Sequence, residues 1–150
     1  MPMTGRSARY FVAVPQVDVW DAYATLSGRD RSTLNDEQRG LVAVCDLRQE
    51  VNSGGFDRYF RYGGGNSALD AWRALRGLLG QDWADLLKEA MDLLGPEYPT
   101  AQADRENLVD ARDLDDQFED LDTRYYALES STDADGRLNE YLSSTPQAMV

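Results

Sequence analysis

Apolar residues recur at intervals of three and four positions through most of this 150-residue chain. Such spacing places side chains on one side of a helix, so each run predicts an amphipathic helix. The runs are Val19, Trp20, Tyr23 and Leu26; Leu41, Val44, Leu47 and Val51; Leu69, Trp72, Leu75 and Leu79; Trp83, Leu86, Leu87, Ala90 and Leu94; and Leu138, Tyr141 and Leu142. Tyr10–Val14 lacks a partner strand, and we interpret it as an extended lead-in. The pattern predicts an all-α fold of about six or seven helices.

Local signals mark the start of two of these helices. Asn35 followed by Gln38 forms a capping-box pattern before the second run. The glycine-rich loop 63–67 precedes the third run, and we expect Asn66 or Ser67 to be the N-cap there. A glycine loop before a helix can bind phosphate, but this loop lacks a Walker lysine and a preceding strand.

The length suits one domain that spans residues 1–150. Residues 1–9 and 143–150 are expected to be loose ends. Tyr10–Val14 is too short for the core of a signal peptide or for a membrane span. We therefore expect a cytoplasmic protein without membrane contact.

Composition excludes several classes of function. The net charge is −12 and the sequence pI is about 4.3, so direct binding to nucleic acid phosphates is not expected. The chain has no His, the commonest general base and metal ligand. Cys45 is the only cysteine, and we interpret it as a small core residue rather than a zinc ligand or reactive thiol. No enzyme activity, cofactor or metal is predicted.

The negative charge is concentrated in one segment. Residues 104–140 hold thirteen acidic and four basic residues. Within this segment a helical stripe is formed by Leu114, Phe118, Leu121, Tyr125 and Leu128. Six carboxylates fall outside the stripe and are expected to face outward: Asp113, Asp115, Asp116, Glu119, Asp120 and Asp122. On a helix they span about 13.5 Å, or roughly one charge per 2.3 Å, against about 1.7 Å for duplex DNA.

Three other interpretations of these acids stay open. An acidic helix face can simply be solvated. Clustered Asp residues can bind Ca²⁺, but the sequence from Asp133 to Ser144 has the wrong register for an EF-hand loop. Paired carboxylates can act as acid and base, yet that chemistry needs one of them in an apolar pocket.

A break between two helices is predicted at Asn52–Gly55. Asn and Gly tolerate the left-handed backbone that ends a helix. An aromatic helical face follows, made by Phe56, Tyr59 and Phe60. The stretch resembles the core motif of the DNA-mimic protein family, which comprises small acidic bacterial proteins. The matching residues are Glu50, Val51, Asn52, Gly54, Gly55, Phe56, Tyr59 and Phe60, whereas Ser53, Arg58 and Arg61 depart from the motif.

The resemblance and the acidic segment together suggest a non-enzymatic regulator that competes with DNA. Its expected partner is a basic DNA-binding protein, for example a transcription factor or a nucleoid protein. The alternative is a helical protein–protein interaction module, of immunity or scaffolding type, whose acidity serves only solubility. The pairs Arg58/Arg61 and Arg73/Arg76 are expected to bind Asp57 and Asp70, or else the acidic face of a second copy in a homodimer.

Overall fold

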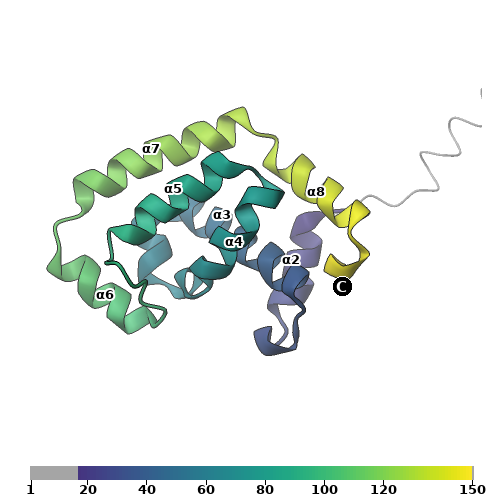
Figure 1. Cartoon of the computed structure of the whole chain (residues 1–150), viewed down its shortest axis with the longest axis horizontal. Coiled ribbons are helices and arrows are strands. Elements are labelled where there is room, and N and C mark those ends of the chain that lie inside the picture. Colours follow the sequence, from purple (N-terminus) through teal and green to yellow (C-terminus); the bar gives the residue numbers. More distant parts are fainter. Residues whose placement is uncertain (1–16, 150) are drawn as a thin grey trace, which may run out of the picture.

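The computed structural model describes residues 17–149, and these fold into seven α-helices without a strand (Figure 1). The helices are α2 (Val19–Ser27), α3 (Asp36–Arg61), α4 (Ala68–Leu78), α5 (Gln81–Asp92), α6 (Gln102–Ala111), α7 (Asp115–Ser131) and α8 (Ala134–Ser144). Three short 3-10 turns join or end them: η1 (Arg31–Thr33), η2 (Gly63–Ser67) and η3 (Pro146–Ala148). The predicted all-α class is confirmed. The interpretations of residues 1–9 and of Tyr10–Val14 fall outside the described residues.

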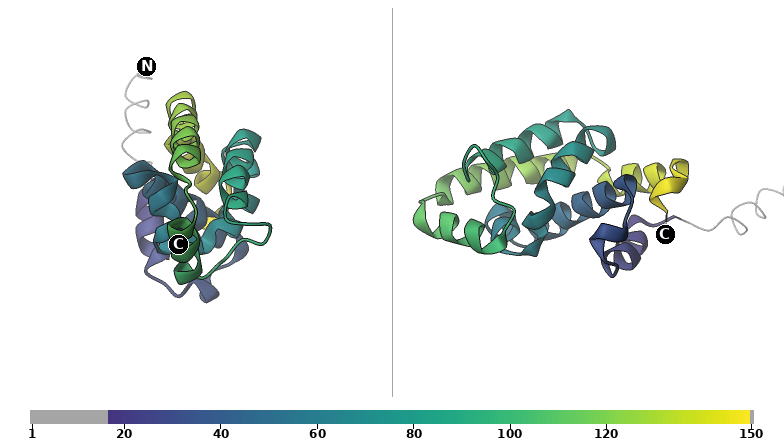
Figure 2. Two further views of the ribbon diagram at one scale, coloured as in Figure 1. Left: turned by 90° about the vertical axis from the view of Figure 1, so that its left-hand side faces the viewer. Right: turned by 60° about the horizontal axis from the view of Figure 1, so that its bottom comes forward.

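The long helix α3 lies at the centre of the fold. It packs against α2, α4, α6 and α7, and α5 in turn packs against α4 and α7 (Figure 2). Its stretch from Gly40 to Arg48 is buried at every position, so α3 is surrounded rather than half-exposed. The capping box predicted at its start is present, because Gln38 N donates to Asn35 Oδ1 at 2.8 Å and Asn35 N donates to Gln38 Oε1 at 3.0 Å. Cys45 is fully buried, as predicted, and burial raises the pKa of its thiol to about 12.

α3 is kinked where the sequence predicts a break. Gly54 and Gly55 leave the helical conformation, and Gly55 has φ 74° and ψ −173°. Asn52 and Ser53 still belong to the helix, so the break is narrower than predicted. After the kink the last turns of α3 bury Phe56, Tyr59 and Phe60, each at most 1% exposed. These rings contact α7 through Tyr125 and Phe118, with centroid distances of 6.1 Å from Phe56 and 5.8 Å from Phe60.

The N-cap predicted for α4 is confirmed in position, but not as a side-chain cap. Ser67 stands at the N-cap position of α4, as predicted, but its side chain makes no capping hydrogen bond, because the side chains of Asn66 and Ser67 are both bound elsewhere. Asn66 Oδ1 accepts from Arg105 at 2.7 Å, and the Ser67 hydroxyl donates to the buried carboxylate of Asp46 at 3.0 Å. The loop before α4 is therefore held by long-range polar contacts instead of by a helix cap.

Residues 143–149 are packed, in contrast to the loose end predicted for residues 143–150, of which residue 150 lies outside the described part of the chain. Residue 144 ends α8, and η3 then turns back onto the start of α3. Asn35 Nδ2 donates to the carbonyl of Gln147 at 2.8 Å, and Gln38 Nε2 donates to that of Met149 at 3.0 Å. Ala148 is fully buried. The polar composition of this segment predicted a loose end, because it gives no sign that Asn35 and Gln38 at the start of α3 bind its carbonyl groups.

Candidate functional site

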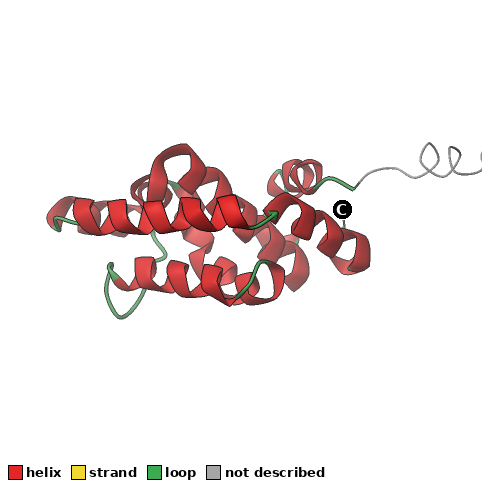
Figure 3. Cartoon of the chain, turned by 90° about the horizontal axis from the view of Figure 1, so that it is seen from above, coloured by secondary structure: helices red, strands yellow, loops and turns green. Residues whose placement is uncertain are grey.

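The acidic face predicted for α7 exists over the first half of the helix. Asp115, Asp116, Glu119 and Asp120 are all exposed. On the opposite side the predicted apolar stripe is buried at Leu114, Phe118, Leu121 and Tyr125, and Leu128 is half-buried. The helical phasing of the sequence thus separates the carboxylates from the core as expected. Figure 3 shows α7 running lengthwise along the molecule.

The other two predicted residues lie differently. Asp113 is exposed but lies in the loop before α7, which begins only at Asp115. Asp122 is half-buried and points toward the kink in α3, where its Oδ1 accepts a hydrogen bond from Phe56 N at 2.8 Å. Burial raises the pKa of Asp122, and the bond from Phe56 only partly offsets this shift. Asp122 comes four positions after Phe118, at the edge of the buried stripe, so it caps the second part of α3 instead of facing outward.

Helix α5 adds a second row of carboxylates that the sequence analysis missed. Its acids follow helical spacing opposite the buried Trp83 and Leu87: they are Asp82, Asp85, Glu89 and Asp92. All four are exposed. α5 packs beside α7, as Figure 1 shows. The three- and four-residue spacing of these acids is visible in the sequence, but the packing of α5 against α7 is not.

We call the eight exposed carboxylates of α5 and α7 the acidic surface: Asp82, Asp85, Glu89, Asp92, Asp115, Asp116, Glu119 and Asp120. All except Asp115 line three neighbouring hollows along the two helices. Two cations interrupt it. Arg124 reaches from α7 to Glu89 on α5 and lowers the pKa of that carboxyl, and Lys88 Nζ lies 2.5 Å from Asp92 Oδ1. The surface therefore keeps a large excess of negative charge.

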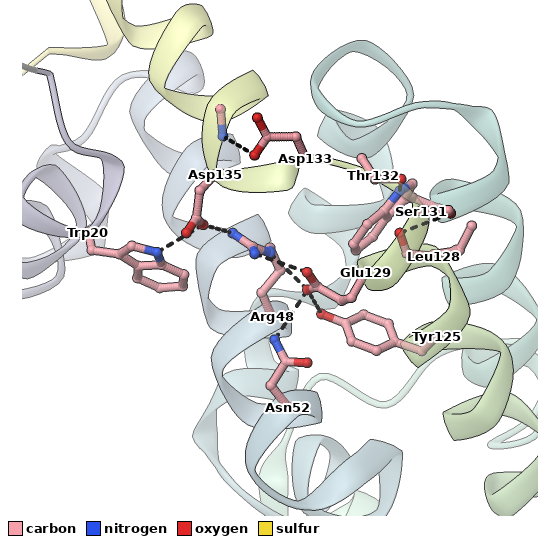
Figure 4. Close-up of polar contacts among 12 residues, drawn as sticks. Trp20, Arg48, Asn52, Tyr125, Leu128, Glu129, Ser131, Thr132, Asp133 and Asp135 are labelled. Carbon is pink, nitrogen blue, oxygen red and sulfur yellow. Dashed lines mark hydrogen bonds and ion pairs between the residues drawn. The ribbon is translucent and has the colours of Figure 1, made fainter.

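An ionic junction centred on the buried Arg48 fixes α7 and α8 to the rest of the fold (Figure 4). Arg48 of α3 is 6% exposed and binds Glu129 of α7 with two hydrogen bonds of 2.9 and 3.0 Å. Its third nitrogen donates to Asp135 of α8 at 2.7 Å, and its guanidinium lies over the ring of Trp20 at 5.4 Å. The hydroxyl of Tyr125 completes the shell of Glu129 at 2.6 Å.

The charges in this junction perturb both carboxyl groups in the same direction. Burial alone would raise the pKa of Glu129, but hydrogen bonds from Arg48 and Tyr125 outweigh burial and lower it. The same balance, with bonds from Arg48 and Trp20, lowers the pKa of Asp135. The junction joins four helices through one guanidinium and is structural in character, since its groups bind one another.

A second buried arginine holds α6 without any carboxylate. Arg105 is fully buried, and no pattern in the sequence predicted its role. Its guanidinium donates to the carbonyl oxygens of Phe60, Tyr62 and Thr100 at 2.8, 2.9 and 2.7 Å. A further bond runs to Asn66. Arg105 thus satisfies the carbonyls at the end of α3 and fixes the glycine-rich turn η2.

The sequence model of the DMP19-like protein family matches residues 32–145. The chain belongs to this family. DMP19-like proteins are DNA mimics and are not a known enzyme family. The resemblance inferred from the sequence is therefore confirmed at the level of the family. Comparison with curated proteins and with solved structures found no significant match.

Within this DMP19-like domain the stretch 50–60 has structural contacts. Glu50 pairs with Arg58 across the kink, with 3.2 Å between Oε2 and Nε. Asn52 donates to Glu129 of the ionic junction at 3.2 Å. The expected pair of Arg61 with Asp57 is present at 3.0 Å, and that of Arg73 with Asp70 is present at 3.9 Å. Arg61 also binds Asp110, so most of these cations already have acidic partners inside the DMP19-like fold.

The described part of the DMP19-like chain offers no grouping of three or more metal-binding side chains. The carboxylates of the acidic surface are all exposed, whereas acid–base catalysis by a pair of carboxyl groups needs one of them to be desolvated. Among residues 17–149 no helix is long and apolar enough to cross a membrane. The arrangement of exposed acids is suited to contact with cationic groups.

Proposed function

We propose that this DMP19-like protein is a non-enzymatic regulator that presents its acidic surface to a basic DNA-binding protein and competes with DNA. The observation that carries the proposal is the pairing of two carboxylate rows on neighbouring helices, α5 and α7. Membership of a DNA-mimic family supports the same function. The partner we propose is a bacterial transcription factor or nucleoid protein, met in the cytoplasm.

The geometry of two rows suits a surface that binds DNA phosphates. Two carboxylate rows on packed helices run side by side, as the two phosphate rows that border a groove of duplex DNA do. Each row rests on buried side chains, Trp83 and Leu87 under α5 and Phe118 and Leu121 under α7. A rigid support keeps the charges in place before binding, so less conformational entropy is lost on association.

Neutralising part of the acidic surface should weaken this competition. The variant Asp85→Asn, Asp115→Asn, Glu119→Gln removes three charges and leaves the buried residues unchanged. Exposed charge pairs contribute at most about 1 kcal/mol each, so we expect binding to weaken by roughly tenfold to a hundredfold. The measurement uses a DNA-binding protein recovered from the source organism at low salt. Displacement of labelled DNA from that protein is titrated with each variant.

A matched control removes the same charge elsewhere. Asp21→Asn, Asp104→Asn, Glu140→Gln changes three exposed acids that lie outside α5 and α7. This control should displace DNA nearly as well as the unchanged protein, because only distant and screened charges are lost. Equal displacement by both variants, or none by the unchanged protein, would reject the proposal in favour of an interaction module whose acidity serves solubility.

A further inference from the structure

A groove with an apolar floor runs between α5 and α7. At one end its floor is Leu93 and Leu121, and at the other it is Leu86 and Leu128. At the first end carboxylates of both helices form the walls, and at the second end the carboxylates come from α5 alone. The groove therefore differs from a plain acidic face, since it offers apolar contact at the base and negative charge at the rim.

Arg124 divides this groove and occupies it with a guanidinium. The group spans from α7 to α5, where its two terminal nitrogens bind the two oxygens of Glu89. One nitrogen also lies 3.3 Å from Asp120 Oδ2, on the opposite wall. The width between the walls is thus matched to a guanidinium, which the protein itself places there.

One turn further along the groove, a carboxylate of α5 again faces a carboxylate of α7. Asp92 comes three positions after Glu89 on α5, and Asp116 comes four positions before Asp120 on α7. Both line the hollow whose floor is Leu93 and Leu121. Two further cations lie nearby. Lys88 binds Asp92, and Arg112 donates to the carbonyl of Leu93 at 2.6 Å. Neither cation bridges the two walls in the way that Arg124 does.

We infer that this hollow, lined by Asp92, Leu93, Asp116 and Leu121, binds an arginine side chain of the protein partner. The methylene stem lies on the two leucines, as long basic side chains bury their stems on apolar surface. The guanidinium binds Asp92 and Asp116, for which its planar, forked donors are better suited than an ammonium group. This site adds detail to the proposed function. That the arginine belongs to a DNA-binding protein rests on the proposed function. The binding of arginine itself does not depend on that function.

The test uses a peptide of eight arginines as the probe, in the absence of DNA and of the natural partner. Asp92→Asn, Asp116→Asn is compared with the control Asp21→Asn, Glu140→Gln, which removes the same charge away from the groove. At physiological salt we expect the first variant to bind about tenfold more weakly than the control. The methyl resonances of Leu93 and Leu121 should shift and saturate with the peptide. Thermal melts verify that both variants fold.

Two further measurements make the arginine site refutable. Arg124→Gln frees Glu89 and Asp120 and should tighten peptide binding severalfold. A peptide of eight lysines should bind more weakly than the arginine peptide. Equal loss in both double variants, unshifted leucine methyls, or equal affinity for the two peptides would overturn the site. If the site fails while the protein still displaces DNA, the proposed function stands, and the reverse outcome leaves the arginine site without a regulatory role.

Discussion

A protein with valine at position 55 is expected to be less stable by about 3 kcal/mol or more. Gly55 has φ 74° and ψ −173°, a conformation that is essentially restricted to glycine. A Cβ at this position would also lie 2.8 Å from Cγ of Asp122 and would overlap its carboxylate. The substitution thus strains the kink and displaces the acceptor of Phe56 N. Urea denaturation followed by circular dichroism measures the loss.

Gly77 is the matched control for this experiment. It lies on the exposed side of α4, where a Cβ would meet nothing within 4 Å. Gly77→Ala should leave stability unchanged or raise it by up to about 1 kcal/mol, since alanine favours a helix. A Gly55→Val protein as stable as the Gly77→Ala protein would show that the kink is not needed for the fold.

Arg48→Ala should cost about 3–5 kcal/mol, because it leaves Glu129 partly buried without its cation. Glu129 is surrounded by Tyr125 and Asn52, which cannot neutralise a carboxylate. Asp135 also loses its partner, so α8 loses its ionic bond to α3. The free energy of unfolding from chemical denaturation is the measured quantity.

Two comparisons separate this effect from the loss of any arginine. Arg73→Ala removes an exposed cation that lies 3.9 Å from Asp70, and it should change stability by less than about 1 kcal/mol. Adding Glu129→Gln to Arg48→Ala should recover part of the loss, because the buried charge is then gone. If the two substitutions changed the free energy of unfolding additively, Arg48 and Glu129 would not interact as their contacts indicate.

The helices that bury an apolar stripe could be predicted from the sequence, and α6 could not. In α6 only Arg105 and Val109 are buried, so its largest buried side chain is a charged one. Hydrophobic periodicity carries no signal for such a helix. The carbonyl groups that bind Arg105 come from the end of α3 and from the connection before α6, and nothing local in the sequence pairs them.

The candidate surface was predictable only on one helix. Phasing alone separated Asp115, Asp116, Glu119 and Asp120 from the core of α7. It could not place Asp122, whose partner is a backbone amide 66 positions away. The acids of α5 were overlooked because the two rows become one surface only when α5 and α7 pack together. The number and spacing of charges along a sequence do not show that α5 and α7 are neighbours.

The two buried arginines give the molecule two ends that respond differently to acid. Arg48 joins α3 to α7 and α8 through carboxylates, whereas Arg105 binds α6 to the end of α3 through carbonyl groups, which acid does not protonate. The one carboxylate among the described residues that links α6 to α3, Asp110, is exposed and contributes little. Glu129 and Asp135 have pKa values lowered below 4.5 and 3.8, so their stabilisation is complete above those values and is lost as the pH falls through the folded ones.

Acid should therefore open this protein from one end. On going from pH 6 to about pH 3 we expect the protection of amide hydrogens in α8 to fall by at least about tenfold. The protection of those in α6 should fall much less. Hydrogen exchange read by mass spectrometry at pH 6 and pH 3, corrected for intrinsic rates, resolves the two segments. Uniform loss of protection along the chain would mean that the ends unfold together. In that case the contacts of Arg105, although insensitive to acid, would be too weak to keep α6 folded once the rest of the protein has unfolded.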